Sequence, residues 1–476
     1  MTPVPTDQLA IDGSVTSLLA EYVSSAELDA IPQDVRDATK LQALDTIGVS
    51  LAAVKLAPGI REIVELLVAW GGVEEATVWG SAHRLPAWAA AFANGAMGHG
   101  LDYDTTFHDA LVHPSAPVVA AVIAVAEQRP GVSGKDVLTA LVVAQDVISR
   151  LALSISRRDG GWKFDWHNSI VFGSFGATAG AAKVLKLDAR QVESAFGIAA
   201  TMATGTMELA YGTESDLRLN YDALPNKAGV MASLLAERGL RGTRSILDGK
   251  AGIYNVYYGG SYDRPSLVGG LGEQFRGGQE IGFKPWPAGI ITHMYIDAAM
   301  KISRENDIQP GDIAKVLVHV GDLSLTLCEP LAARQAPGSV NDAKYSIPFS
   351  TAVALLRRAI PLDDFTEQGI RNLAILEIAA KVEPVYDSSL NTLHRISPGG
   401  VTITLNDGRH FSKMVEFAYG DAKVPLSAAA VVAKFRNCVE ASGLNWSRDR
   451  TDHLIDLILN LEELTDTKLL GTALGV

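Results

Sequence analysis

The first half of the chain contains five long segments in which apolar residues occupy nearly every helical position. Each segment is rich in Ala, Leu and Val, and polar residues are too sparse to cover a solvent-facing side. A helix that is apolar all round must be buried against other helices. The pattern therefore predicts a large helical domain. The five segments are residues 35–51, 86–97, 114–127, 134–156 and 169–186.

Alternation of apolar and polar residues, the pattern of half-buried strands, is found only after about Gly282. A strong hairpin-turn signal, Asn406-Asp407-Gly408, separates two of these segments. Helical periodicity continues between the strands, so this part of the sequence predicts a smaller α+β domain. The expected strands are residues 314–320, 401–405 and 410–417, and the expected helices are residues 347–356 and 363–382.

Length and pattern together indicate more than one domain. A chain of 476 residues exceeds the size that one hydrophobic core can serve. We expect a large all-helical domain over residues 1–275 and an α+β domain over residues 276–418. Helical periodicity then returns, so we expect residues 419–476 to fold back onto the helical domain. The predicted fold class is mainly α with a smaller α+β domain.

Charge and cysteine content exclude several classes of protein. A net charge of −13 argues against nucleic acid or a membrane surface as partner, because both are polyanionic. The only cysteines, Cys328 and Cys438, are far apart, which argues against a disulfide framework and fits a reducing compartment. The N-terminus has neither the basic nor the apolar region of a signal peptide, and no stretch predicts a membrane span. We expect a cytoplasmic protein.

The richest polar segment runs from Gly100 to Ser115, between two expected helices. It holds three aspartates and two histidines, and such groups in a partly desolvated loop suit general acid–base chemistry. The alternative carries equal weight: Asp102 or Asp109 caps a helix, and His113 is a hydrogen-bonded core residue.

Three further segments each present one ionisable residue. His167 stands just before a small-residue helix, at a place where the next two residues would cap better. Arg218 lies in an apolar context, and a buried arginine nearly always has an anionic partner or ligand. An internal ion pair with Asp216 or Asp222 is the alternative. Lys284 lies in a loop stiffened by two prolines, where a solvated surface lysine is the alternative.

Signatures of metals and nucleotide cofactors are absent from the sequence. There is no HExxH, no GxGxxG after a strand, no P-loop and no GxSxG. His99, His108 and His113 are irregularly spaced for a metal site. We therefore expect neither a metal nor an organic cofactor.

Several motifs, taken in order, resemble the MmgE/PrpD family, whose members include 2-methylcitrate dehydratase, cis-aconitate decarboxylase and iminodisuccinate epimerase. The most specific is Leu101-Asp102-Tyr103-Asp104 followed by His113-Pro114-Ser115, which is similar to the family's LDFDD…HPS block. The resemblance runs nearly end to end. Its other motifs are Asp45-Thr46-Ile47-Gly48-Val49, Val78-Trp79-Gly80, Ala93-Asn94-Gly95-Ala96, residues 173–187, Ala343-Lys344-Tyr345-Ser346-Ile347-Pro348 and Val424-Pro425-Leu426-Ser427.

The resemblance implies a helical domain joined to an α+β domain, an active site between them, a homodimer, and no metal or organic cofactor. By position it implies that Asp102, Thr106, His113 and His167 are pocket residues. It also matches Lys284 to the lysine of the family's KPYP-like segment.

The family's reactions share a carbanion or enolate beside a carboxylate, which requires a base, an acid and cations. We expect His113 and His167 to be the acid and the base, in an order that the sequence leaves open. Asp102 is expected to orient a histidine. Arg218 and Lys284 are expected to bind carboxylates of a small anionic substrate.

Thr106 and Tyr345 are expected to add hydroxyl contacts to this substrate. Two positions depart from the family pattern. Arg218 stands where many members have lysine, and an arginine cannot readily donate a proton. Ala288-Gly289-Ile290 stands where many have Cys-Cys-His, which indicates a pocket for a more apolar or bulkier substrate arm.

The preferred prediction is a lyase that eliminates water from a small di- or tricarboxylate, as 2-methylcitrate dehydratase does. Decarboxylation and epimerisation are close alternatives, because the same base and cations serve all three reactions. A catalytically inactive binding or scaffold protein is the alternative from another class.

Overall fold

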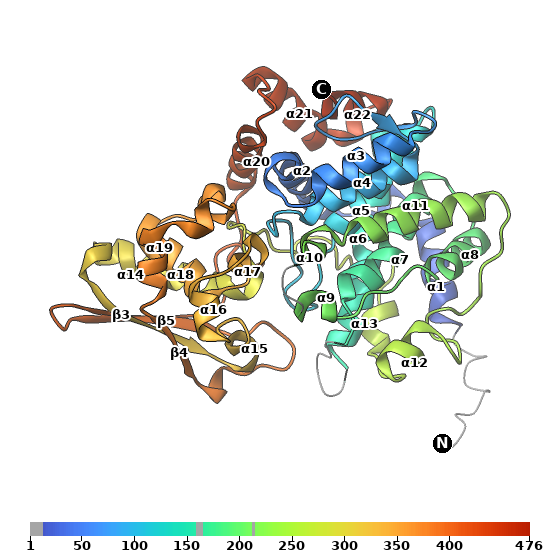
Figure 1. The fold of residues 1–476 in the computed structure, drawn as a ribbon. Coiled ribbons are helices and arrows are strands. Elements are labelled where there is room, and N and C mark those ends of the chain that lie inside the picture. Colours follow the sequence, from blue (N-terminus) through green and yellow to red (C-terminus); the bar gives the residue numbers. More distant parts are fainter. Residues whose placement is uncertain (1–12, 159–164, 212–214) are drawn as a thin grey trace, which may run out of the picture.

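The computed structural model describes residues 13–158, 165–211 and 215–476, which form a helical body and a smaller α+β body side by side (Figure 1). This arrangement confirms the predicted fold class. The helices of the first body, up to residue 268, are α1 (Val15–Ser25), α2 (Gln33–Leu56), α3 (Ile60–Trp70), α4 (Ala87–His99), α5 (Ala116–Gln128), α6 (Gly134–Ser156), α7 (Asn168–Val184), α8 (Ala189–Ala199), α9 (Glu208–Tyr211), α10 (Leu217–Asn220), α11 (Ala223–Glu237), α12 (Ile253–Tyr258) and α13 (Arg264–Val268). The five predicted apolar segments correspond to α2 and α4–α7.

Small residues let the central helices approach closely. Helix α7 packs against α5, α6 and α11. A Cβ atom at Gly180 of α7 would lie 2.5 Å from Val122, and one at Gly229 of α11 would lie 2.5 Å from Ala177. Larger residues at these positions would force the helices apart, which explains the run of Gly, Ala and Ser in α7.

Helix α6 is long and apolar enough to cross a membrane by length and composition alone. Its whole apolar stretch is buried inside the protein, however, between α7, α5 and α13. This is the environment of a core helix.

The α+β body is built on a four-stranded sheet of order β4-β3-β5-β6. Strand β3 (Ile313–Val320) pairs in parallel with β4 (Val382–Tyr386) and antiparallel with β5 (Gly399–Leu405), which forms a hairpin with β6 (His410–Val415). Helices α14 and α18 lie over one face (Figure 1). The helices of this body are α14 (His293–Glu305), α15 (Asp322–Leu325), α16 (Leu331–Gln335), α17 (Val340–Lys344), α18 (Ile347–Arg357) and α19 (Leu373–Ala379).

The predicted helix over residues 363–382 is wrong. The segment contains two 3-10 turns, the short helix α19, and the start of strand β4. Asn372 breaks the helical run, because its side chain caps α19 by accepting from the N–H of Ala374. Pro384 is tolerated in β4 because this strand is at the edge of the sheet.

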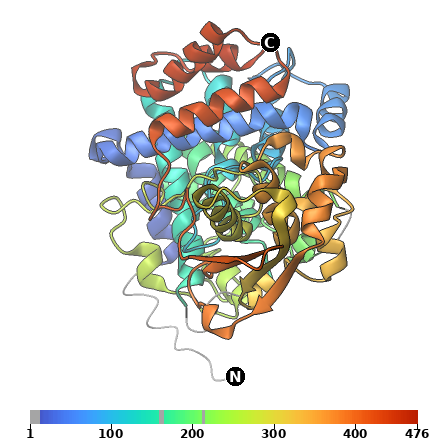
Figure 2. The same ribbon diagram turned by 90° about the vertical axis from the view of Figure 1, so that its left-hand side faces the viewer.

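The C-terminal segment returns to the helical body. Helix α20 (Ala428–Ser442) runs along α2, as the red and blue helices of Figure 2 show. A Cβ atom at Gly48 of α2 would lie 2.8 Å from Phe435 of α20, so glycine permits this contact. Helices α21 (Arg448–Leu459) and α22 (Lys468–Leu474) continue over α2 and α5.

Candidate active site

A cavity of about 240 Å³ opens between the two bodies. Its lining comes from the loops beside α4, α7 and α9 on one side and from residues 284–345 on the other. The structure brings six of the seven predicted site residues to this cavity. They are Asp102, His113, His167, Arg218, Lys284 and Tyr345.

The seventh residue, Thr106, is absent from the lining residues that the structure describes. Its backbone forms two hydrogen bonds with Gly282, Thr106 N to Gly282 O at 3.0 Å and the reverse at 2.9 Å. The Thr106 hydroxyl is buried and has no hydrogen-bond partner among the described residues. Thr106 therefore pairs through its backbone with the segment that leads into the α+β body, and its predicted contact with substrate is not supported.

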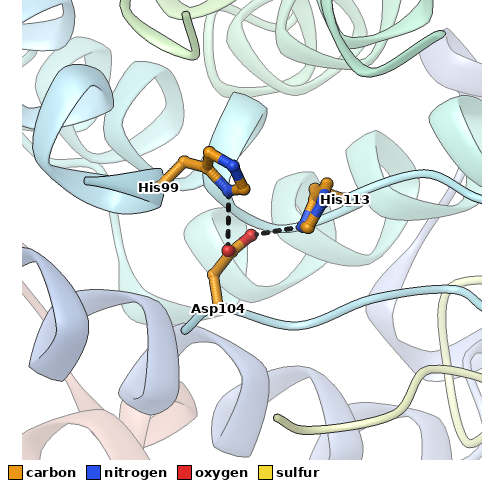
Figure 3. A group of neighbouring side chains, drawn as sticks. All are labelled: His99, Asp104 and His113. Carbon is orange, nitrogen blue, oxygen red and sulfur yellow. Dashed lines mark hydrogen bonds and ion pairs between the residues drawn. The ribbon is translucent and has the colours of Figure 1, made fainter. Parts of the chain in front are cut away.

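Asp104 joins two histidines (Figure 3). One carboxylate oxygen lies 2.8 Å from Nδ1 of His99, and the other lies 2.9 Å from Nδ1 of His113. Nδ1 of His113 also faces the Thr105 carbonyl at 3.1 Å. Since both neighbours only accept, this nitrogen carries the proton. A neutral His113 then has its lone pair on Nε2.

His99, Asp104 and His113 form a triad whose electrostatics keep His113 available as a base. Burial lowers the pKa of His113 below its ordinary value, although the Asp104 carboxylate opposes the shift. Burial would raise the pKa of Asp104, but His113 and His99 together hold that pKa well below its usual range. At neutral pH, Asp104 is thus an anion and His113 is a neutral imidazole at the cavity wall.

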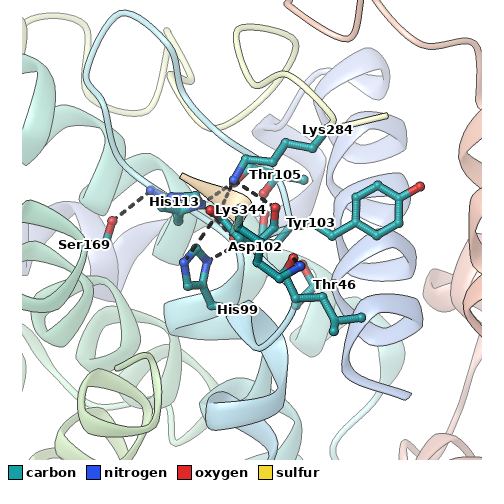
Figure 4. Close-up of polar contacts among 12 residues, drawn as sticks. Thr46, His99, Asp102, Tyr103, Thr105, His113, Ser169, Lys284 and Lys344 are labelled. Carbon is teal, nitrogen blue, oxygen red and sulfur yellow. Dashed lines mark hydrogen bonds and ion pairs between the residues drawn. The ribbon is translucent and has the colours of Figure 1, made fainter. Parts of the chain in front are cut away.

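Asp102 does not have the role that the sequence suggested. Its carboxylate pairs with the Lys284 ammonium, and it lies 3.8 Å from Nε2 of His99 (Figure 4). Asp102 has a φ of 48°, a left-handed conformation that is uncommon for residues other than glycine. The carboxylate that orients His113 is Asp104. Lys284 is expected from the sequence to bind substrate, but its ammonium forms an ion pair with the Asp102 carboxylate.

His167 is the N-cap residue of α7 but makes no capping bond with its side chain. Its ring packs against Tyr221 at 4.3 Å between centroids. Burial, assisted by the Arg218 charge, lowers the pKa of His167 well below its ordinary value. Nδ1 is buried and has no hydrogen-bond partner within the described parts of the chain. His167 is therefore a second neutral imidazole at the cavity.

Arg218 lies on α10 with its guanidinium 3.7 Å from the ring centroid of Tyr345. Its Nε and Nη1 are buried without a hydrogen-bond partner among the described residues. The proposed internal ion pair is not formed: both carboxylate oxygens of Asp222 are buried without a hydrogen-bond partner among the described residues, and burial raises the pKa of Asp222 well above its ordinary value. Asp216 is exposed at the start of α10. A half-buried arginine with two buried, unused donors is a site for an anionic ligand.

Tyr345 packs directly on the backbone of the segment opposite. A Cβ atom at Gly289 would lie 2.7 and 2.8 Å from its ring carbons. Burial raises the pKa of the Tyr345 phenol well above its ordinary value, with Arg218 opposing the rise and Asp102 adding to it. The phenol is therefore protonated at neutral pH and can donate.

We expect Gly289→Ala to lower kcat/KM about ten- to a hundredfold, because the added methyl must displace the Tyr345 ring beneath Arg218. Gly338→Ala is the matched control, since its Cβ would have no neighbour within 4 Å. Steady-state kinetics of the two variants test this. Equal activity in both would show that the position of Tyr345 is unimportant.

Comparison with known families decides the classification. The MmgE/PrpD N-terminal domain matches residues 17–265, and the MmgE/PrpD C-terminal domain matches residues 286–461. This chain belongs to the MmgE/PrpD family. The resemblance seen in the sequence motifs is thereby confirmed.

Similar members of the MmgE/PrpD family include cis-aconitate decarboxylases. That of Homo sapiens is 29% identical over 97% of this chain and 94% of its own length. That of Aspergillus terreus is 26% identical over 98% of this chain and 96% of its own length. A cis-aconitate decarboxylase-like protein of Aspergillus oryzae is 25% identical over 96% of each chain. The expected enzyme class, a lyase, agrees with these relatives.

Two residues of this MmgE/PrpD site were missed at the sequence level. Asp104 was part of the recognised LDYD motif, but only Asp102 was assigned a role. Lys344, in the AKYS motif, is buried and donates to the carbonyls of Leu101 at 2.7 Å and Pro287 at 3.0 Å. It ties together the two loops that carry Asp102 and Gly289, and burial lowers its pKa to about 7. The sequence signal that could have identified Lys344 is its position inside the recognised AKYS motif.

The group His99, Asp104 and His113 also brings three potential metal-ligand atoms within 4.8 Å of one another. Both Asp104 oxygens, however, face ring nitrogens at hydrogen-bond distance, and a metal would need those nitrogens deprotonated. We therefore expect dialysis against EDTA to leave turnover unchanged. Loss of activity that added Zn²⁺ restores would make the triad a metal site.

Proposed function

We propose that this protein is a lyase that forms a carbanion or enolate next to a carboxylate of a small anionic substrate. One observation carries the proposal: Asp104 holds the His113 base in the cavity that also contains Arg218, whose Nε and Nη1 have no hydrogen-bond partner among the described residues. A base and an anion-binding cation in one desolvated cavity are the minimum for abstracting a proton beside a carboxylate. Convergence of six predicted residues there speaks against an inactive scaffold.

Elimination of water is the reaction that these groups support best. Arg218 binds the substrate carboxylate, and Nε2 of His113 removes the proton from the neighbouring carbon. The electron pair of the broken C–H bond forms the enolate, which the guanidinium stabilises. The C–O bond then breaks as the Tyr345 phenol protonates the leaving oxygen, so that water departs. Return of a proton from His113 to Tyr345 restores the site.

Decarboxylation is the second candidate, and the activity of the relatives favours it. The bond between carbon and a carboxyl group breaks in place of the C–H bond, CO₂ leaves, and the electron pair remains on carbon. Arg218 stabilises this carbanion through a remaining carboxylate, Tyr345 or Lys284 protonates the carbon, and a proton from solvent restores the donor.

Proton NMR in deuterium oxide tests the proposal with citrate, 2-methylcitrate, cis-aconitate and substituted succinates. New vinyl signals indicate elimination, loss of a carbon indicates decarboxylation, and deuterium uptake without product indicates proton abstraction alone. The matched control is His113→Gln, which should be inactive. Absence of all three changes across the panel would contradict the proposed function.

The acid limb of the pH profile of kcat/KM is expected to have its midpoint below 6.5. His113 acts as a base only when neutral, so activity is present above its pKa and is lost as the pH falls through it. Because burial lowers the pKa of His113 from 6.5, the loss occurs at more acidic pH than for a free imidazole. A midpoint above 6.5 would exclude this assignment.

A further inference from the structure

The cavity has two chemically different sides. Most of its ionisable groups are near Arg218, while most of the remaining lining is apolar, with Asn168, Ser169, Thr326 and Arg334 as the polar exceptions. Met207 and Trp166 supply apolar surface from the helical body. Ile290, Ile291, Leu323 and Leu327 supply it from the α+β body. Neither set is needed for the acid–base chemistry described above.

Few positive charges are free to bind carboxylates. Three cationic side chains line the cavity in the described part of the chain: Arg218, Lys284 and Arg334. Lys284 is paired with Asp102. Arg334 already donates from Nε to the Glu329 carbonyl at 3.2 Å and from Nη1 to the Tyr345 carbonyl at 3.3 Å.

Arg218 is thus the cavity cation with two buried donors, Nε and Nη1, that have no hydrogen-bond partner among the described residues. A tricarboxylate seated there would place a further carboxylate against the apolar wall. An ionised group loses its hydration on such a surface and gains no hydrogen bond in return. Burial of an alkyl or aryl group in the same place would strengthen binding, because it removes apolar surface from water.

We propose that the substrate carries its carboxylates at one end and an apolar arm at the other, with the arm against Ile290, Leu323 and Leu327. This inference rests on the proposed function only in seating a carboxylate on Arg218. The substrate class is therefore an alkyl- or aryl-substituted dicarboxylate, and a tricarboxylate such as cis-aconitate is a poor fit.

Isothermal titration calorimetry with unreactive probes tests the arm. The probes are succinate, methylsuccinate, butylsuccinate, hexylsuccinate and the tricarboxylate tricarballylate. We expect Kd to fall by about fourfold for each methylene that enters the wall. Tricarballylate should bind no more tightly than succinate. Equal affinity for all alkylsuccinates, or tightest binding of tricarballylate, would overturn the inference.

A variant series locates the arm. Leu323, in α15, and Leu327, in the turn that follows it, both line the cavity from the α+β body, and replacing both by serine makes this part of the wall polar. Leu323→Ser/Leu327→Ser should lose far more affinity for hexylsuccinate than for succinate. Leu373→Ser is the control, since Leu373 is 74% exposed on the same body. An identical loss for all probes would place the arm elsewhere.

Binding and turnover separate this inference from the proposed function. If no compound of the NMR panel reacts but affinity rises with chain length, the function fails and the apolar arm stands. If cis-aconitate is turned over efficiently and tricarballylate binds best, the function stands and the apolar arm fails.

Discussion

Arg218→Met is expected to lower kcat/KM by about a hundredfold or more, because it removes the cation that holds the substrate carboxylate in a desolvated cavity. Methionine keeps much of the side-chain length and apolar character, so the change acts mainly on charge. Arg218→Lys should recover part of the loss, since it restores the charge without the planar fork. Steady-state kinetics with the substrate found by NMR measure both.

The same variant should fold at least as stably as the parent protein. Nε and Nη1 of Arg218 are buried without hydrogen-bond partners in the described part of the chain, so the folded state loses their hydration and gains no hydrogen bond, which offsets the contact of the guanidinium with the Tyr345 ring. We therefore expect the Tm of Arg218→Met to stay level or rise while activity falls. Arg371→Met, on an exposed ion pair with Glu367, is the control and should change neither property. A large fall in Tm would show that Arg218 is structural.

The helical body was predictable because burial leaves a direct trace in the sequence. Apolar residues at most helical positions indicated the core helices, and the small residues of α7 indicated close packing. The segment around α19 was not predictable in this way. Its apolar residues fit helical spacing, but a capping side chain at Asn372 and pairing of β4 with β3 override that local preference.

Most residues of the candidate site could be predicted from the sequence, but the contacts among them could not. Asp102 and Asp104 are two residues apart in one loop, and nothing in their spacing tells which one meets His113. In the folded chain Asp102, which has a left-handed backbone conformation, pairs with Lys284, while Asp104 pairs with His113. Lys284 reaches Asp102 across 182 residues of chain, a pairing that only the tertiary fold creates.

Asp104→Asn is expected to lower kcat by about a thousandfold or more, with the fold retained. An asparagine has one accepting oxygen, whereas Asp104 accepts from both His99 and His113. The imidazole that faces the amide NH₂ must move its proton to Nε2, and if this is His113 the cavity loses its base. A comparable change of tautomer costs about 10⁴ in kcat in the serine protease triad.

The pH profile distinguishes this positioning role from a general loss of structure. The Asp104 charge raises the pKa of His113 against the effect of burial, so the residual activity of Asp104→Asn should have its acid limb at lower pH than the parent protein. Asp109→Asn, at an exposed aspartate of the same loop, should change neither kcat nor the profile. Circular dichroism checks that both variants are folded. Full activity in Asp104→Asn would mean that His113 does not need this carboxylate and that another group, with His167 first among the candidates, is the base.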